Sequence, residues 1–160
     1  MNRKIGWVVL LVVVIGVALY FVWQTGRAEE TEIKLYYYNP ELDKDEAGNI
    51  MCSEKGLVPV VRTLSSKNVI EDTIALLIKG ELTEEERKEG LTTEYPLEGF
   101  NLVKTELKDG VLTLTFEDPN NKTSGGSCRV NILWSQIAKT AKQFPQVQEV
   151  RFLPEELFQP

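Results

Sequence analysis

Histidine is absent from the 160-residue sequence. Its absence excludes the Ser-His and Cys-His pairs that activate nucleophiles, and it also excludes histidine-based metal sites. The phosphate-binding signatures G-x-G-x-x-G and G-x-x-x-x-G-K-[ST] are missing as well. A Ser-Lys pair would require Ser124 or Ser127 to act with Lys122, but the intervening SGGS segment is typical of an ordinary loop. We therefore expect that the protein is not an enzyme.

Acidic residues are missing from the first 27 positions, and residues 5–23 carry no charge of either sign. As a helix, this run would extend about 28 Å, which is close to the thickness of the hydrocarbon core of a bilayer. Arg3 and Lys4 precede the run, whereas the residues after Arg27 are rich in glutamate. This asymmetry places the N-terminus in the cytoplasm. The sequence thus predicts one transmembrane helix, with the rest of the chain outside.

A cleaved secretory signal is the alternative, because Gly26 and Ala28 are small residues with the spacing of a cleavage site. The apolar run is longer than the core of about 7 to 15 residues that is typical of a signal peptide, which favours an uncleaved anchor. Both interpretations export the residues that follow. We expect residues 1–27 to form a cytoplasmic N-terminus and transmembrane anchor, and residues 28–160 to form one extracytoplasmic domain.

Positive charge is scarce in this expected domain. All 24 acidic residues lie after residue 27, with 15 of the 18 basic residues, so the domain has a net charge of −9. A negative surface of this kind argues against nucleic acid or an anionic membrane surface as a partner.

Cysteine is also rare, since only Cys52 and Cys128 are present and both lie in the expected domain. In an oxidising compartment an even number of cysteines predicts a disulfide, and a bridge that encloses so many residues could contribute about 4 kcal/mol to stability. Two thiolates without histidine cannot complete a zinc site unless carboxylates join them.

Hydrophobic periodicity predicts mixed secondary structure. Residues 32–39 alternate between two faces. Residues 56–62 form a second β-branched run, in which Pro59 indicates an edge strand or an irregular pairing. Two helices should follow, one that begins at Asn68 with Glu71 in a capping box and ends at Gly80, and a short acidic one between Thr83 and Gly90.

The pair Asp109-Gly110 is the strongest local signal, because this dipeptide is typical of a two-residue hairpin turn. Counting outward from it sets Leu107 against Leu112, Thr105 against Leu114 and Val103 against Phe116. The last strongly periodic segment is an amphipathic helix from Ser127 as N-cap to Pro145, followed by a strand over residues 147–153 with Val150 and Phe152 facing the core.

The predicted order is therefore β-β-α-α-β-β-α-β. Each amphipathic helix must bury one face, which predicts an α+β two-layer sandwich with a small, mostly antiparallel sheet and helices on one face.

Several motifs follow one another over residues 32–153: LYYY (35–38), LVPVVR (57–62), ALL with KG (75–77, 79–80), LTTEYP (91–96), the DG hairpin (109–110), QFPQV (143–147) and VRF (150–152). Together they resemble the GerMN domain, the sporulation and spore germination domain of bacterial envelope proteins. The resemblance implies a fold like the ring-building modules of secretion and sporulation complexes, and a role in assembly without catalysis. The anchor would then lie in the bacterial cytoplasmic membrane as a single-pass helix.

The segment LDKDEAGNIMCSE after the first predicted strand has some features of a calcium-binding loop. Asp43, Asp45 and Glu54 match positions 1, 3 and 12, with Gly48 at position 6 and Asn49 at position 7, but Ala47 replaces the ligand at position 5. The alternative is a polar turn tethered by Cys52. The absence of flanking helices favours this second interpretation, and no cofactor other than calcium is suggested.

Two functions agree with these features. The first is a non-catalytic, membrane-anchored interaction module of the cell envelope that binds envelope proteins or associates with itself. Tyr36 and Tyr38, on the outward face of the first strand, are its candidate contacts, although packing under a helix or loop is an equal alternative. The second is an extracytoplasmic domain for a cell-wall or small polar ligand, bound between the loops that carry Cys52 and Cys128.

Overall fold

The computed structural model describes residues 30–159 together with Val13 and Ile15. The predicted transmembrane helix over residues 5–23 lies, apart from these two positions, outside the described residues. Within the part of the chain that the structure describes, no helix has both the length and the apolar character needed to cross a membrane.

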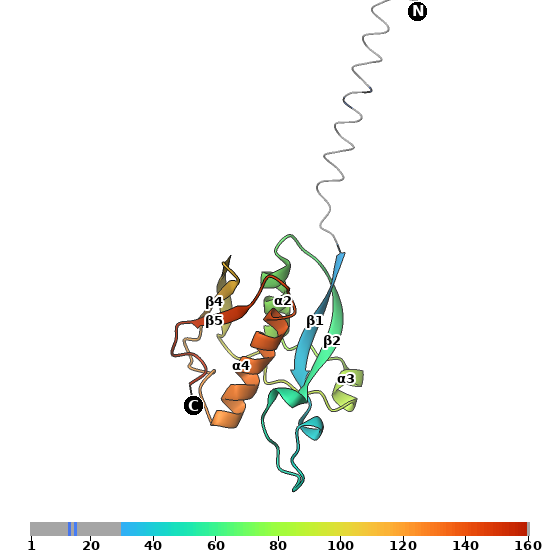
Figure 1. The fold of residues 1–160 in the computed structure, drawn as a ribbon, viewed down its shortest axis with the longest axis vertical. Helices are drawn as coiled ribbons and strands as arrows, with labels where there is room; N and C mark the ends of the chain where they lie inside the picture. Colours follow the sequence, from blue (N-terminus) through green and yellow to red (C-terminus); the bar gives the residue numbers. More distant parts are fainter. Residues whose placement is uncertain (1–12, 14, 16–29, 160) are drawn as a thin grey trace, which may run out of the picture.

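The predicted order of strands and α-helices, β-β-α-α-β-β-α-β, is confirmed (Figure 1). Two short 3-10 helices, η1 (Pro40–Leu42) and η2 (Glu54–Gly56), lie in the loop between the first two strands. The strands and α-helices are β1 (Glu30–Tyr38), β2 (Leu57–Ser65), α2 (Val69–Ile78), α3 (Glu84–Lys88), β3 (Asn101–Lys108), β4 (Val111–Glu117), α4 (Ser127–Ala141) and β5 (Glu149–Leu153).

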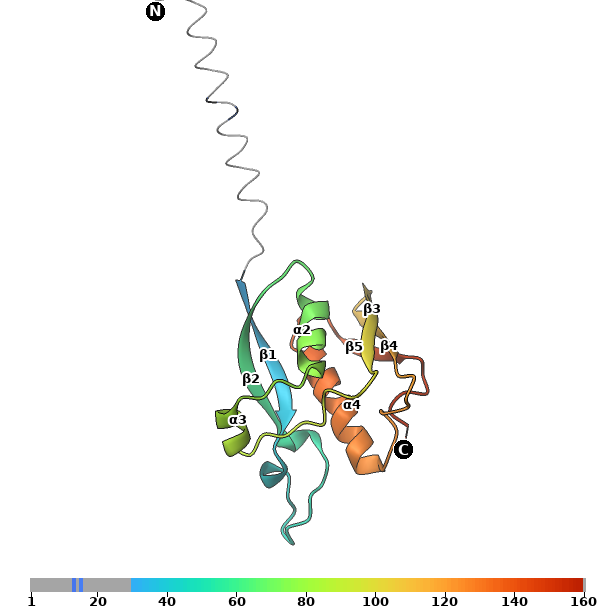
Figure 2. The same cartoon turned by 180° about the vertical axis from the view of Figure 1, so that it is seen from behind.

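The strands form two small sheets, so the prediction of one sheet with helices on one face is wrong. Strands β1 and β2 make an antiparallel pair, while β3, β4 and β5 make a second sheet in which β4 and β5 are parallel. Helices α2 and α4 lie between the two sheets, as both views show (Figures 1 and 2). The fold class is thus α+β, with small sheets and few helices.

The reason for the separation is that β1 has a helix instead of a strand beside its outer edge. Gln143, just after α4, accepts a hydrogen bond from the Lys34 N–H at 2.7 Å and donates one to the Lys34 carbonyl at 2.7 Å. Thr140 of α4 accepts from the Tyr36 N–H at 3.1 Å. Further along, Tyr38 and Thr92 exchange two backbone hydrogen bonds. Because these groups satisfy the edge, β1 does not pair with a strand of the other sheet.

The helix ends agree only in part with the predicted caps. Thr83 and Glu86 form the capping box of α3, but Asn68 makes no side-chain bond at the start of α2. The Asn68 N–H instead donates to the Ser66 hydroxyl at 2.8 Å, so this residue serves the preceding turn. Helix α4 begins at Ser127 with Gly126 as its N-cap, and it ends at Ala141, earlier than predicted.

The β3–β4 hairpin has the predicted turn, with positive φ angles of 50° at Asp109 and 82° at Gly110. This conformation matches the twist of the flanking strands. The predicted pairs of Leu112 and Leu114 are confirmed, but a bulge between Leu102 and Lys104 shifts the register beyond them. Leu102 therefore lies opposite Phe116, and the predicted partner Val103 is 55% exposed.

One hydrophobic core joins both sheets to the helices. Its members include Ile33, Leu35 and Tyr37 of β1, Ile74 and Leu77 of α2, Leu112, Leu114 and Phe116 of β4, and Leu133 and Ile137 of α4. The segment after β5 closes one end of this core, where the Phe158 ring contacts the rings of Phe100 and Phe152. Val150 and Phe152 pack against the core from β5, as predicted.

The bulge yields a test of the register. We expect Leu102→Ala to lower the free energy of unfolding by about 2 kcal/mol because its side chain packs against the core. Val103→Ala, one position along the same strand, should change it by about 0.5 kcal/mol or less because its side chain is exposed. Urea unfolding of both variants measures the difference. A larger loss for Val103→Ala than for Leu102→Ala would contradict the bulge and support the predicted pairing of Val103 with Phe116.

Candidate interaction site

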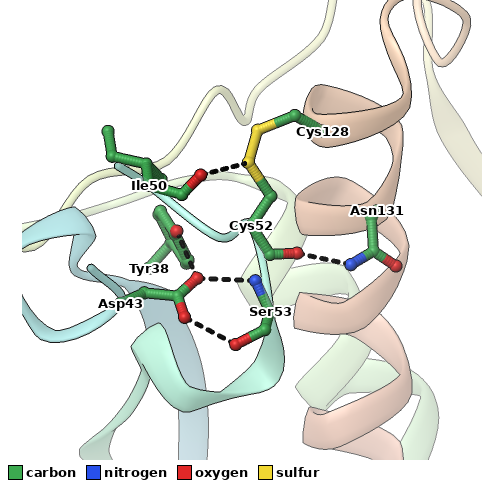
Figure 3. Close-up of a disulfide and its surroundings, with 7 residues drawn as sticks. All are labelled: Tyr38, Asp43, Ile50, Cys52, Ser53, Cys128 and Asn131. Atoms are coloured by element: carbon green, nitrogen blue, oxygen red, sulfur yellow. Dashed lines mark hydrogen bonds between the residues drawn. A yellow bond between two sulfur atoms is a disulfide. The ribbon is translucent and has the colours of Figure 1, made fainter. Parts of the chain in front are cut away.

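A disulfide between Cys52 and Cys128 joins the β1–β2 loop to the first turn of α4 (Figure 3). The predicted bridge is thus present, with Cα atoms 5.2 Å apart across 76 positions of sequence. Beside it, the Asn131 side chain of α4 donates a hydrogen bond to the Cys52 carbonyl at 2.5 Å. Covalent and polar contacts therefore hold this loop against one helix.

Asp43 organises the loop from within. Its carboxylate is only 2% exposed and accepts three hydrogen bonds, from the Tyr38 hydroxyl at 2.6 Å and from the Ser53 N–H and hydroxyl at 2.5 Å each (Figure 3). These donors come from the end of β1 and from the residue that caps η2. One carboxylate thus joins the two ends of the loop.

The environment of Asp43 decides its charge state. Burial alone would raise the pKa of this carboxyl group, but the hydrogen bonds from Ser53 and Tyr38 outweigh burial and leave the pKa below its usual value. The pKa of Tyr38 is raised, first by burial and then by its hydrogen bond to Asp43. Near neutral pH the pair is therefore a phenol that donates to an ionised carboxylate.

Asp45 shapes the tip of the loop in a similar way. Its side chain accepts hydrogen bonds from the Ala47 N–H at 2.9 Å, the Asn49 N–H at 2.7 Å and the Asn49 amide at 2.9 Å. Gly48 has a φ of 86°, a conformation that glycine adopts without strain. Lys44 and Ile50 pair across this turn. The tip is thus a closed turn with its own hydrogen bonds.

The calcium candidates do not converge on one point. The oxygens of Asp43 and Asp45 serve donors within the loop, and Asn49 is itself one of those donors. Glu54 faces away toward α4, where its carboxylate lies 3.4 Å from the Lys139 ammonium. Among the described residues there is no group of three or more acidic or cysteine side chains that could hold a metal. In this structure these side chains make the hydrogen bonds and the ion pair of a tethered polar turn.

The two tyrosines have different surroundings. Tyr38 is 4% exposed and points to Asp43, so the interpretation of Tyr38 as an exposed contact is wrong. Strand alternation placed it on the outward face, but the following loop folds back and covers it. Tyr36 is half-buried and lines a depression with Glu54, Lys139 and Lys142.

The large side chains that this region exposes to solvent are apolar, and they were not among the candidates predicted from the sequence. Leu42, Ile50 and Met51 all lie in the loop and all are exposed, with Met51 at 57%. The sequence could have pointed to them, because they are three large apolar residues in a segment otherwise dominated by acidic and turn-forming residues. Large apolar side chains in a polar loop are informative when the structure leaves them uncovered.

Two adjoining depressions lie beside the disulfide. One, of about 470 Å³, is lined by Met51, both cysteines, Ser127 and Asn131. The other, of about 400 Å³, shares Ser127 and Asn131 and continues along α4. Its remaining lining residues are Val130, Trp134 and Phe158. Both are open to solvent, so together they form a groove and not an enclosed cavity.

Ser124 and Lys122, which the sequence offered as a Ser-Lys pair, have other partners in the structure. The Ser124 hydroxyl donates to the Asn121 carbonyl at 2.9 Å, while the Lys122 ammonium lies 3.8 Å from the Glu98 carboxylate. Arg129 donates to the carbonyls of Lys122 and Ser124, which fixes the shape of the loop. These polar groups therefore serve the local fold.

The Asp43 network predicts a pH dependence. A carboxyl group with a lowered pKa stabilises the fold above its unfolded pKa of about 4, and this contribution is lost as the pH falls through the folded pKa. Asp43→Asn should therefore lower the free energy of unfolding at pH 7 by about 2 kcal/mol. The gap to the wild type should shrink as the pH falls below about 5. Tyr38→Phe removes one of the donors that lower the pKa of Asp43, so its smaller gap should shrink over the same range. A gap that does not change with pH would contradict this role.

The disulfide predicts a redox dependence. Reduction should lower the free energy of unfolding by up to about 4 kcal/mol, because the bridge restricts the unfolded chain over 76 positions. Urea unfolding with and without dithiothreitol measures the loss. The Cys52→Ser/Cys128→Ser double variant is the control and should match the reduced wild type in both conditions.

Comparison with known proteins places this geometry in context. A structure of the tandem GerMN domains of the sporulation protein GerM from Bacillus subtilis is similar, with a TM-score of 0.51 and 23% identity. The match covers 79% of this chain and 40% of that chain, so the chain spans less than half of the tandem protein. This likeness shows a GerMN-like fold.

A second structure, of a candidate lipoprotein from Clostridium perfringens, matches with a TM-score of 0.38 and 14% identity over 79% of this chain and 76% of that chain. No curated protein matches at a significant level. The family model named Germane, which is described as sporulation and spore germination, matches residues 18–156. Because this match spans most of the sequence, the chain belongs to the Germane family of sporulation and spore germination domains.

Proposed function

We propose that the protein is a non-catalytic interaction module of the bacterial cell envelope, held at the cytoplasmic membrane by residues 5–23 with residues 28–160 outside. Membership of the sporulation and spore germination family supports a role in such processes. The tandem-domain relative from Bacillus subtilis is a sporulation protein, and we extend an assembly role from it to this chain.

The Cys52–Cys128 disulfide is the observation that carries this proposal. Structural disulfides persist in oxidising compartments and are rare in the cytosol, so a bridge that fixes a loop to a helix favours an exported domain. The charge pattern around the apolar run agrees, because basic residues precede the run and acidic residues dominate after it.

The described surface supports binding to a protein more than binding to a small ligand. The disulfide does bring together the acidic loop and the Ser-Gly-Gly-Ser loop, as the ligand-binding alternative requires. The depressions beside it are open, however, and the adjacent Met51, Ile50 and Leu42 are exposed apolar side chains. Small-ligand sites usually enclose most of the ligand, whereas protein interfaces use broad surfaces with apolar anchors.

Fusion reporters test the location. Alkaline phosphatase fused after residue 160 should be active in a bacterial host, because this enzyme folds only where its own disulfides form, and a cytoplasmic fluorescent protein at the same position should stay dark. A variant without residues 5–23 is the control and should give an inactive phosphatase. The opposite pattern would refute export.

A further inference from the structure

We propose that the groove beside the disulfide docks an apolar, positively charged segment of another envelope protein. We name this groove, together with the loop of residues 41–54 that forms one wall, the docking tip. The inference rests on the proposed function, since it assigns a surface and a class of partner to the interaction module.

The docking tip is rigid, although it lies in a loop. Asp43 fixes both ends of the loop, and the disulfide with Asn131 fastens it to α4 (Figure 3). Asp45 closes the turn at the tip of the loop. A rigid surface loses little conformational entropy when it binds. The loop is therefore pre-organised for docking. It holds side chains that face solvent in fixed positions.

The docking tip presents apolar surface that the fold itself does not use. Met51 is 57% exposed at one end of the groove, and Ile50 and Leu42 are exposed on the same loop. Trp134 lines the other end from α4 and is only partly buried. Aromatic and methionine side chains are enriched at protein interfaces and supply their anchors. The partner segment should therefore carry apolar side chains that enter this groove.

Charge selects the partner. Residues 41–54 contain five acidic residues and one lysine, and that lysine, Lys44, is already paired with Glu41 at 2.6 Å. The carboxylates of Asp45 and Glu46 are exposed and have no ion-pair partner among the described residues. A second copy of this docking tip would be repelled, whereas basic residues beside an apolar segment would be attracted. Two copies are thus not expected to dock tip to tip, and the occupant that we propose is a different protein with lysine or arginine beside its apolar contacts.

The position of the docking tip agrees with a protein partner and not with the membrane that holds the chain. It lies at the far end of β1 from Glu30, where the N-terminal segment joins the domain (Figures 1 and 2). The docking tip and the point where the proposed anchor joins the domain therefore lie at opposite ends of β1.

Site-specific photo-crosslinking in the native bacterium tests this inference on the full chain. The photoreactive residue p-benzoylphenylalanine replaces Met51 in one variant and Val61 in the control, because Val61 is 51% exposed but lies on β2. Position 51 should give a discrete adduct, and mass spectrometry should place the bond in a peptide of another protein with apolar residues and a net positive charge. Position 61 should give no such adduct.

A charge reversal tests the electrostatic step. Glu46→Lys should reduce the adduct at position 51 about threefold or more. Glu117→Lys makes the same change at another exposed glutamate, at the end of β4, and should leave the adduct unchanged. Circular dichroism and the oxidised state of the two cysteines verify that both variants fold.

The outcomes separate the two proposals. Adducts only at position 61, a bond to another copy of this chain, a partner peptide without basic residues, or insensitivity to Glu46→Lys would each overturn the docking tip as proposed and leave an interaction module in place. If formaldehyde crosslinking of the same cells also yields no adduct, the interaction function itself fails.

Discussion

Among the described residues no strand lies on the outer side of β1, and the hydrogen bonds that Thr140 and Gln143 make to its edge take the place of a ladder. An unsatisfied edge would cost stability and would invite pairing with other chains. The same contact holds α4 beside β1, while the opposite side of the helix, through Trp134, meets Phe152 of the second sheet. The position of α4 is therefore the constraint that relates both sheets and brings Cys128 to the loop.

The loop between β1 and β2 depends on this arrangement. Its two ends meet at Asp43, and the disulfide and Asn131 connect its outer part to a helix already held in place. A buried ionised carboxylate is stable when several donors surround it, and here the donors are Tyr38 and Ser53. Polar groups that resemble metal ligands in sequence thus serve as internal acceptors.

Local patterns predicted the element types and their order, because each amphipathic period and turn pair acts over a few residues. The Asp109-Gly110 hairpin and the Thr83 capping box are examples. The bulge at Val103 escaped prediction, since an inserted residue shifts the alternation without any glycine or proline to mark it. The split into two sheets escaped as well, because hydrogen bonds from Gln143 to Lys34 join segments 109 positions apart. For the site, two cysteines predicted the bridge, but only the fold shows that Tyr38 is covered and Met51 is not.

The pairing of the cysteines also bears on how the chain acquires its structure. Cys52 is synthesised 76 positions before Cys128, so its thiol must wait while most of the domain is made. During that interval the thiol has no partner within its own chain, because the sequence contains no third cysteine. A single chain can therefore form only one bridge and never needs to reshuffle it. The risk during maturation is linkage between two nascent chains, which makes prompt docking of α4 beside β1 the step that protects the thiol.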